Sequence, residues 1–180
     1  MADRFIIREM TPADCGGRAF VHYTAWRETY RDIIDRRILD ANTLEHCREV
    51  AERFPENTLV ALDRREGERV IGFLRYEPEA RRFASLGGAS EISALYLLRE
   101  YQGLGLGRRL LEAAPEKLPR KAVVLFAARG NERAIAFYEH MGFRLTGHSV
   151  TEALYGAELT VVEMVLYRGK ETEDESGCFR

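Results

Sequence analysis

Three glycines alternate with leucines in one short segment, Gln102-Gly103-Leu104-Gly105-Leu106-Gly107, and Arg108 follows them directly. Glycine lets the backbone turn tightly and lets its amides approach a ligand closely. Successive N–H groups in such a turn, where a helix begins, form a concavity that binds anions. The segment therefore predicts a site for a phosphate or pyrophosphate, to which Arg108 adds positive charge. A tight strand-to-helix turn without a ligand is the alternative interpretation.

The glycine spacing separates this segment from two well-known phosphate motifs. The dinucleotide-binding fingerprint requires G-x-G-x-x-G, and the Walker motif requires G-x-x-x-x-G-K-[ST]. Here the pattern is G-x-G-x-G, and no Lys-Ser or Lys-Thr pair follows it. The spacing disfavours both a dinucleotide and a nucleoside triphosphate bound in the manner of those motifs.

The elements around this turn are predicted from hydrophobic patterns. Residues 91–98 form a strand that enters the turn, and a helix follows over residues 108–117. Residues 122–127 read as a buried strand, and residues 131–141 as an amphipathic helix that ends at Gly142. Further strands are expected at residues 5–8, 58–63, 70–76, 143–147 and 159–166, and helices at 11–26, 30–34 and 44–54. The prediction is an α+β fold, with a mostly antiparallel sheet and helices on both faces.

Two blocks of the sequence resemble a known family. The glycine segment, after Leu95-Tyr96-Leu97, is similar to the Q/R-x-x-G-x-G/A signature of the GCN5-related N-acetyltransferase (GNAT) superfamily. A later block is similar to the family pattern N-x-x-A-x-x-F-Y-x-x-x-G-F, and it runs from Asn131 through Ala134, Phe137 and Tyr138 to Gly142-Phe143. The N-terminal Ile7-Arg8 and Thr11-Pro12-Ala13-Asp14 resemble the family's first strand and helix, so the resemblance spans residues 5–167. Arg99-Glu100 departs from it, since many relatives have proline there.

This resemblance implies an acyl-CoA N-acyltransferase fold with a splayed sheet. It implies acetyl-CoA as co-substrate, with no metal, and acetyl transfer to a primary amine by direct attack. The pantetheine arm would pair with the strand at residues 91–98, and the pyrophosphate would lie on the turn amides. The cofactor-binding residues it implies are Leu95, Tyr96, Leu97, Gln102, Gly103, Leu104, Gly105, Leu106, Gly107, Arg108, Asn131, Phe137 and Tyr138.

Three catalytic residues follow from the resemblance. Glu91 matches the position of the catalytic base in the histone-acetyltransferase branch, and a salt-bridged Glu at a strand end is the alternative. The backbone N–H of Leu95 is the candidate oxyanion donor, freed from the ladder by a bulge near it; pairing within the sheet is the alternative. Tyr138 is the candidate acid for the leaving sulfur, and a packed aromatic ring is the alternative.

The amine acceptor is less constrained by the sequence. His22, Trp26 and Tyr30 recur at i, i+4 and i+8, so they share one helix face. That face is either a core-facing stripe or a substrate wall, and Trp26 and Tyr30, with Glu91, are the candidate substrate residues. The acceptor is expected to be a small-molecule amine (polyamine-like or amino-acid-like) or a peptide amine. The alternative function is a catalytically weak acyl-CoA sensor or interaction module, although Glu91, Asn131 and Tyr138 favour an enzyme.

Composition limits the remaining classes of function. The 180 residues, 46% hydrophobic and 31% charged, are typical of one globular domain, expected at residues 1–168. Residues 169–180 hold four acidic and two basic side chains, so an acidic and solvated tail accounts for the net charge of -2. The balanced charge of the body predicts no nucleic-acid partner. The sequence contains no apolar run of about 20 residues, so no contact with a membrane is predicted either.

Cysteine and histidine usage indicates the compartment. Cys15, Cys47 and Cys178 form no C-x-x-C pair, and the four histidines are scattered without the spacing of metal ligands. A reduced, cytoplasmic protein without a metal site is expected. The sequence leaves a homodimer open.

Overall fold

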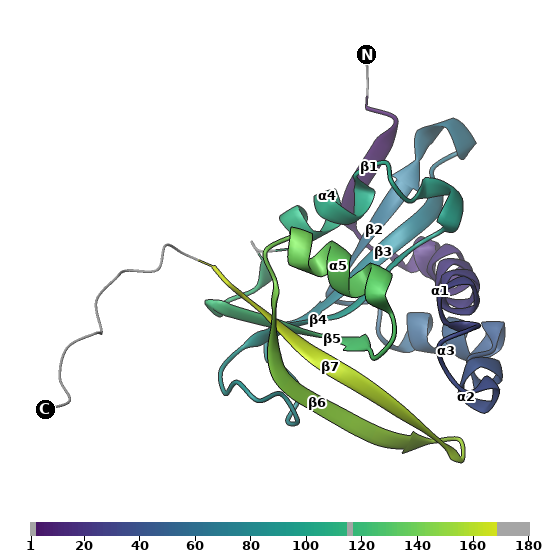
Figure 1. Ribbon diagram of the computed structural model, residues 1–180. Coiled ribbons are helices and arrows are strands. Elements are labelled where there is room, and N and C mark those ends of the chain that lie inside the picture. Colours follow the sequence, from purple (N-terminus) through teal and green to yellow (C-terminus); the bar gives the residue numbers. More distant parts are fainter. Residues whose placement is uncertain (1–2, 115–116, 169–180) are drawn as a thin grey trace, which may run out of the picture.

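A computed structural model describes residues 3–114 and 117–168. Its seven strands form one open sheet in the order β1-β2-β3-β4-β5-β7-β6 (Figure 1). The mixed α+β architecture confirms the expected fold class. The strands are β1 (Phe5–Glu9), β2 (Thr58–Asp63), β3 (Arg69–Glu77), β4 (Ser90–Leu97), β5 (Ala122–Ala128), β6 (Arg144–Leu154) and β7 (Ala157–Tyr167). The α-helices are α1 (Cys15–Tyr30), α2 (Arg36–Ala41), α3 (Leu44–Arg53), α4 (Leu106–Ala113) and α5 (Glu132–His140).

The contact between β4 and β5 differs from every other strand pair in the sheet. These two strands run parallel, whereas all other neighbours are antiparallel. Their pairing covers only Ser90–Ile92 of β4 and Val123–Leu125 of β5. Beyond that point β4 stays paired with β3 as far as Leu97, and β5 stays paired with β7. The sheet therefore splits between its two central strands.

Helices cover both faces of the sheet, and two consecutive residues of β4 show this. The ring of Tyr96 lies 5.1 Å from the ring of His22 on α1. A Cβ atom placed on Gly107 of α4 would lie 3.6 Å from Leu97. Because successive side chains of a strand point to opposite faces, α1 and α4 lie on opposite faces of the sheet. Between them β2 is buried along its whole length, which accounts for its unbroken apolar sequence at residues 59–62.

Three predicted elements differ most from the observed ones. Residues 30–34 were expected to form a helix, but the amides of Ile33 and Ile34 bond to the Tyr30 carbonyl in a turn that ends α1. The next helix is instead α2, which begins after Asp35, whose carboxylate accepts a hydrogen bond from the Arg37 amide at 2.8 Å. The strands β6 and β7 are also longer than expected. Most of β6 is exposed, so its sequence lacks the alternation that predicts a strand.

The loop at residues 78–89, between β3 and β4, packs on β5 and β7. The ring of Phe83 lies 4.9 Å from that of Phe126 on β5. The buried carboxylate of Glu163 on β7 accepts a hydrogen bond from the Ser85 amide at 2.8 Å, and a second from the Ser85 hydroxyl. Thr146 of β6 donates a third at 2.8 Å. This loop is thereby held against the half of the sheet that lies beyond the split.

Two further observations concern the ends of the chain and the membrane. Within residues 3–114 and 117–168, no helix is long and apolar enough to cross a membrane. The predicted acidic tail, residues 169–180, lies outside the described residues, so the domain boundary at residue 168 stays a prediction.

The close approach of β3 to β4 depends on Gly72. A Cβ atom there would lie 2.2 Å from Leu97 Cδ2 and 2.9 Å from the Tyr96 carbonyl oxygen. We expect Gly72→Ala to lower the free energy of unfolding by about 1–3 kcal/mol, the usual range for overpacking a core. Denaturant unfolding measures this. Gly87→Ala is the control, because a Cβ at Gly87 meets nothing within 4 Å. Equal stabilities of the two variants would contradict the prediction.

Candidate active site

A cavity of about 780 Å³ occupies the split between β4 and β5. Its walls come from β4 after the point of divergence, from the end of β5, from the last turn of α1 and from α5. The turn before α4 closes one end. Of the thirteen predicted cofactor-binding residues, twelve line this cavity, and Leu104 alone does not. Leu104 is instead an exposed apolar side chain.

The glycine turn has the backbone that its sequence predicts. Gly103 and Gly105 both have φ of +77°, a left-handed conformation that a side chain would strain. A Cβ atom on either would meet nothing within 4 Å, so the space in front of them is open. The side-chain amide of Gln102 donates to the Leu97 carbonyl at 3.0 Å and ties the turn to the end of β4. The first amides of a helix lack partners within it, so those of α4 are available to an anion.

Gly107 has a different function in the turn. A Cβ atom on it would lie 3.1 Å from the ring of Phe137, which is tighter than ordinary van der Waals contact. The absent side chain lets α4 and α5 approach each other beside the cavity. Phe137 therefore packs against the turn, while Tyr138, the next residue, also lines the cavity.

A bulge in β4 lies near the predicted oxyanion donor. The register with β3 shifts at this point. Ala94 faces Arg75 and Ile92 faces Tyr76, so no residue of β3 stands opposite Ser93. Leu95 itself lies opposite Leu74 and lines the cavity. The expected bulge is therefore present, two residues before Leu95. The donor function of the Leu95 amide stays a prediction.

Three tyrosines and an asparagine form one wall of the cavity: Tyr30, Tyr96, Asn131 and Tyr138. Burial raises the pKa of Tyr138 well above the ordinary phenol value, and the neighbouring Tyr30 raises it further. Burial also raises the pKa of Tyr96, and the adjacent Tyr30 adds to that effect. The pKa of Tyr30 is raised by burial, against the opposing effect of hydrogen bonds from Tyr96 and Asn131. All three phenols are therefore neutral at pH 7.

Asn131 holds this wall to the start of α5. Its side-chain oxygen accepts a hydrogen bond from the Ala134 amide at 3.2 Å, as a helix N-cap does. The residue is 6% exposed, and it lines the cavity together with Tyr30, the last residue of α1. Asn131 therefore caps α5 and also lines the cavity, as expected of a cofactor-binding residue.

Glu91 lies away from these residues. It is fully buried at the paired start of β4 and does not line the cavity. Its carboxylate accepts hydrogen bonds from the Arg81 amide at 3.0 Å and from Arg81 Nε at 2.8 Å, and it forms an ion pair with the same guanidinium. The structure thus brings Tyr138 and Leu95 into the cavity but not Glu91. The salt-bridged alternative describes its observed surroundings.

The predicted stripe on α1 divides between core and cavity. Tyr30 lines the cavity, whereas Trp26 does not; the two rings lie 4.6 Å apart. His22 faces Phe73 and Tyr96, and burial together with nearby Arg18 lowers its pKa to about 4, so it is neutral at pH 7. Further residues of this helix and of the turn after it line the cavity and were not predicted from the sequence. They lie at i, i+3, i+4 and i+7, a spacing that could have identified them: Ala25, Glu28, Thr29 and Asp32.

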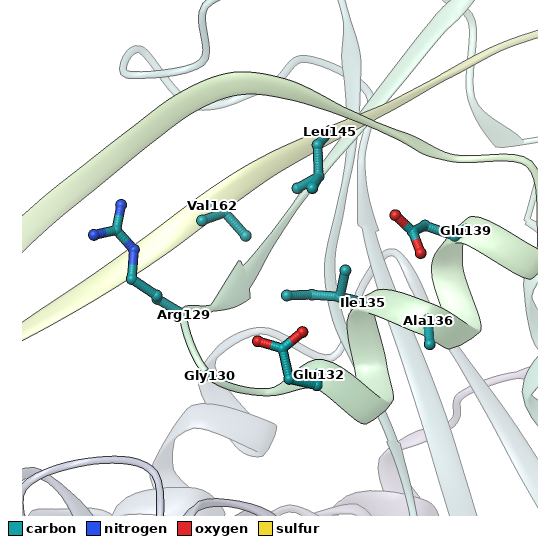
Figure 2. A pocket seen from close by; sticks show the side chains of 8 residues that line it. All are labelled: Arg129, Gly130, Glu132, Ile135, Ala136, Glu139, Leu145 and Val162. Carbon is teal, nitrogen blue, oxygen red and sulfur yellow. The ribbon is translucent and has the colours of Figure 1, made fainter.

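A second, smaller cavity of about 300 Å³ lies on the outer side of α5. Figure 2 shows Ile135 of α5 facing Val162 of β7 and Leu145 of β6, with charged side chains around them. None of the predicted catalytic residues lines it. Across the described part of the chain, no group of three or more His, Cys, Asp or Glu side chains is arranged to hold a metal ion. The cavity in the split is therefore the candidate active site.

Comparisons with known proteins agree with this geometry. A family model described as the acetyltransferase (GNAT) family matches residues 16–143. "Probable N-acetyltransferase Rv2775" of Mycobacterium tuberculosis is 29% identical over 171 residues, which cover 90% of this chain and 93% of that protein.

Two solved structures share the fold at low sequence identity. PaiA N-acetyltransferase from Thermoplasma acidophilum, in complex with coenzyme A, has a TM-score of 0.63 at 22% identity and covers 91% of this chain and 98% of its own. Arabidopsis thaliana NAA60, in complex with a bisubstrate analogue, has a TM-score of 0.63 at 18% identity, with coverages of 91% and 98%. Because the family model matches more than half of its length, the chain belongs to the GNAT family and is an acetyl-CoA-dependent N-acetyltransferase.

Proposed function

We propose that this protein transfers the acetyl group of acetyl-CoA to a primary amine by direct attack within the cavity between β4 and β5. The observation that carries the proposal is the arrangement of that cavity. It has a glycine turn with amides for a pyrophosphate at one end and a wall of neutral phenols beside the free edge of β4. The acceptor is either a small-molecule amine, polyamine-like or amino-acid-like, or a peptide amine.

The cofactor would lie along the free edge of β4. Residues 94–97 pair with β3 on one side only, so the other edge can accept the pantetheine amides as an added strand. The turn at residues 103–107 would hold the pyrophosphate, with Arg99 and Arg108 supplying positive charge at the same end of the cavity. The coenzyme A in the Thermoplasma structure and the bisubstrate analogue in the Arabidopsis structure support this assignment.

The chemistry needs two groups near the thioester. As the amine nitrogen attacks the carbonyl carbon, negative charge develops on the carbonyl oxygen, and the Leu95 amide would stabilise it. When the carbon–sulfur bond breaks, the leaving sulfur needs a proton, which the Tyr138 hydroxyl would supply. The raised pKa of Tyr138 keeps that proton in place throughout the neutral range.

The base that deprotonates the amine is a separate question. Glu91 is the base suggested by family resemblance, but its carboxylate is occupied by Arg81 and lies outside the cavity. These contacts favour a structural function, in which Glu91 anchors the loop at residues 78–89. The incoming ammonium would then lose its proton to water before it attacks.

Replacement of one hydroxyl tests the acid. Tyr138→Phe keeps the ring but removes the proton donor, so we expect kcat to fall about 100-fold, within the usual contribution of general acid catalysis. The acetyl-CoA dissociation constant should stay close to that of the wild type. Because burial and Tyr30 raise the pKa of Tyr138, the wild-type rate should show no decline from loss of this proton below about pH 10. Release of free thiol from acetyl-CoA measures the rate.

Tyr155→Phe is the matched control, because that tyrosine is 62% exposed at the tip of the β6–β7 hairpin. An unchanged kcat in Tyr138→Phe would remove Tyr138 as the acid. Binding of acetyl-CoA by the wild type without turnover of any amine would instead favour a sensor of the same fold.

Glu91→Gln separates the structural function from the base function. The substitution weakens a charge-assisted contact to Arg81, which is itself half exposed, so we expect the free energy of unfolding to fall by about 1–2 kcal/mol. The pH dependence of kcat/KM should not shift. Glu163→Gln, which loosens the same loop from β7, is the control for effects of loop mobility on the rate. A shifted pH profile in Glu91→Gln alone would restore the base function.

A further inference from the structure

Two carboxylates line the active-site cavity at the end of α1. Ala25, Glu28 and Thr29 share one face of α1, Asp32 lies in the turn directly after the helix, and all four line the cavity. Ala25 is buried and Thr29 is half-buried, whereas Glu28 and Asp32 are exposed. The two carboxylates therefore lie at the mouth of the cavity, while the tyrosine wall lies deeper.

Neither carboxylate is neutralised by the protein. Among the ion pairs of the described residues, none involves Glu28 or Asp32. Arg27 lies next to Glu28 in the chain, but its guanidinium bonds to Asp40 at 3.1 Å, and Arg31 does not line the cavity. The cavity therefore presents two uncompensated negative charges to whatever enters its mouth.

Helix stability does not account for these two acids. Negative charge near a helix C-terminus opposes the helix dipole. The dipole effect acts on both acids, because Glu28 lies in the last turn of α1 and Asp32 lies in the turn directly after its last residue, Tyr30. A cation bound at the mouth would offset this effect. The two acids therefore destabilise the helix when no ligand is bound, and their placement favours a positively charged ligand.

The charges of the cavity are also divided by position. Arg99 and Arg108 line it beside the glycine turn, where the pyrophosphate would lie. Glu132 and Arg133 at the start of α5 also line it, as adjacent residues of opposite charge. The two acids come from the end of α1 and the turn after it. Helix α1 lies on the face of the sheet opposite to α4. One part of the cavity thus fits an anion, and another fits a cation.

Resting on the function proposed above, we propose that the acceptor carries a second cationic group besides its reacting amine, and that Glu28 and Asp32 bind that group at the mouth of the cavity. The reacting amine lies deeper, beside the wall formed by Tyr30, Tyr96 and Tyr138. The shared chemistry is two ammonium groups separated by a short chain. A linear aliphatic diamine has it, and so does a peptide with lysine next to its free N-terminus.

Paired probes that differ only in the second charge test this. We would measure kcat/KM with acetyl-CoA for butylamine against 1,4-diaminobutane, and for the peptide Ala-norleucine-Ala against Ala-Lys-Ala. The dicationic member of at least one pair should be preferred by about fivefold, the size expected of two exposed ion pairs. That preference should fall as ionic strength rises, because exposed charges are screened. The pair that shows it distinguishes a diamine from a peptide.

The double variant Glu28→Gln/Asp32→Asn should reduce the preference to about one, because it removes both of the exposed ion pairs to which the fivefold preference is attributed. The quantity compared is the ratio of the two kcat/KM values within a pair, so a loss of activity that affects both substrates equally leaves it unchanged. Glu49→Gln/Glu52→Gln is the matched control. It also removes two exposed carboxylates, from α3, and neither of them lines the cavity. That control should retain the full ratio.

The outcomes separate this inference from the function on which it rests. Acetylation of the probes without a dicationic preference, or a preference that survives in the double variant, overturns the inference and leaves the proposed function in place. Absence of thiol release with all four probes contradicts the proposed function itself, and the inference with it.

Discussion

The short parallel contact between β4 and β5 is the constraint on which the rest of the site depends. Three residue pairs join the strands, and beyond Ile92 and Leu125 each strand keeps only its outer neighbour. Backbone amides and carbonyls in a protein interior need partners, so an unpaired strand edge inside a fold favours a ligand that can pair with it. The cavity is the space that this divergence creates, and its walls are those elements that the two half-sheets carry.

Several contacts hold the split in its shape. The bulge at Ser93 changes the register of β4 where it leaves β5, and Gly72 lets β3 follow that path closely. On the other side, Phe137 packs against Gly107 and fixes α5 beside the turn. Asn131 caps α5 and lines the cavity together with Tyr30 of α1, so one side chain serves both the start of the helix and the cavity wall. The residues that line the cavity are therefore often the same residues that hold its shape.

The parts of the site that the sequence predicts are those fixed by local backbone requirements. Gly103 and Gly105 have left-handed φ values that only glycine adopts freely, so their spacing carries the information directly. The surroundings of Glu91 could not be predicted in this way, because Arg81 belongs to a loop without a motif and reaches Glu91 only through the tertiary fold. On α1, each step of four residues rotates the side chain about 40° beyond a full turn of the helix. Tyr30 therefore reaches the cavity, while Trp26 and His22 pack beside it.

Under the proposed function, the distribution of charge would leave selection of the acceptor to the mouth of the cavity rather than to its deep part. Burial keeps Tyr30, Tyr96 and Tyr138 neutral, and it keeps His22 behind them neutral as well. Neutral phenols can donate and accept hydrogen bonds beside a thioester, but they distinguish poorly between amines of different total charge. Discrimination by charge therefore requires ionised groups at the solvent boundary, where a carboxylate keeps its charge without the cost of desolvation. In this cavity Glu28 of α1 and Asp32 of the turn after it lie at that boundary, so under the proposal they could select the amine while the chemistry beneath them stays the same.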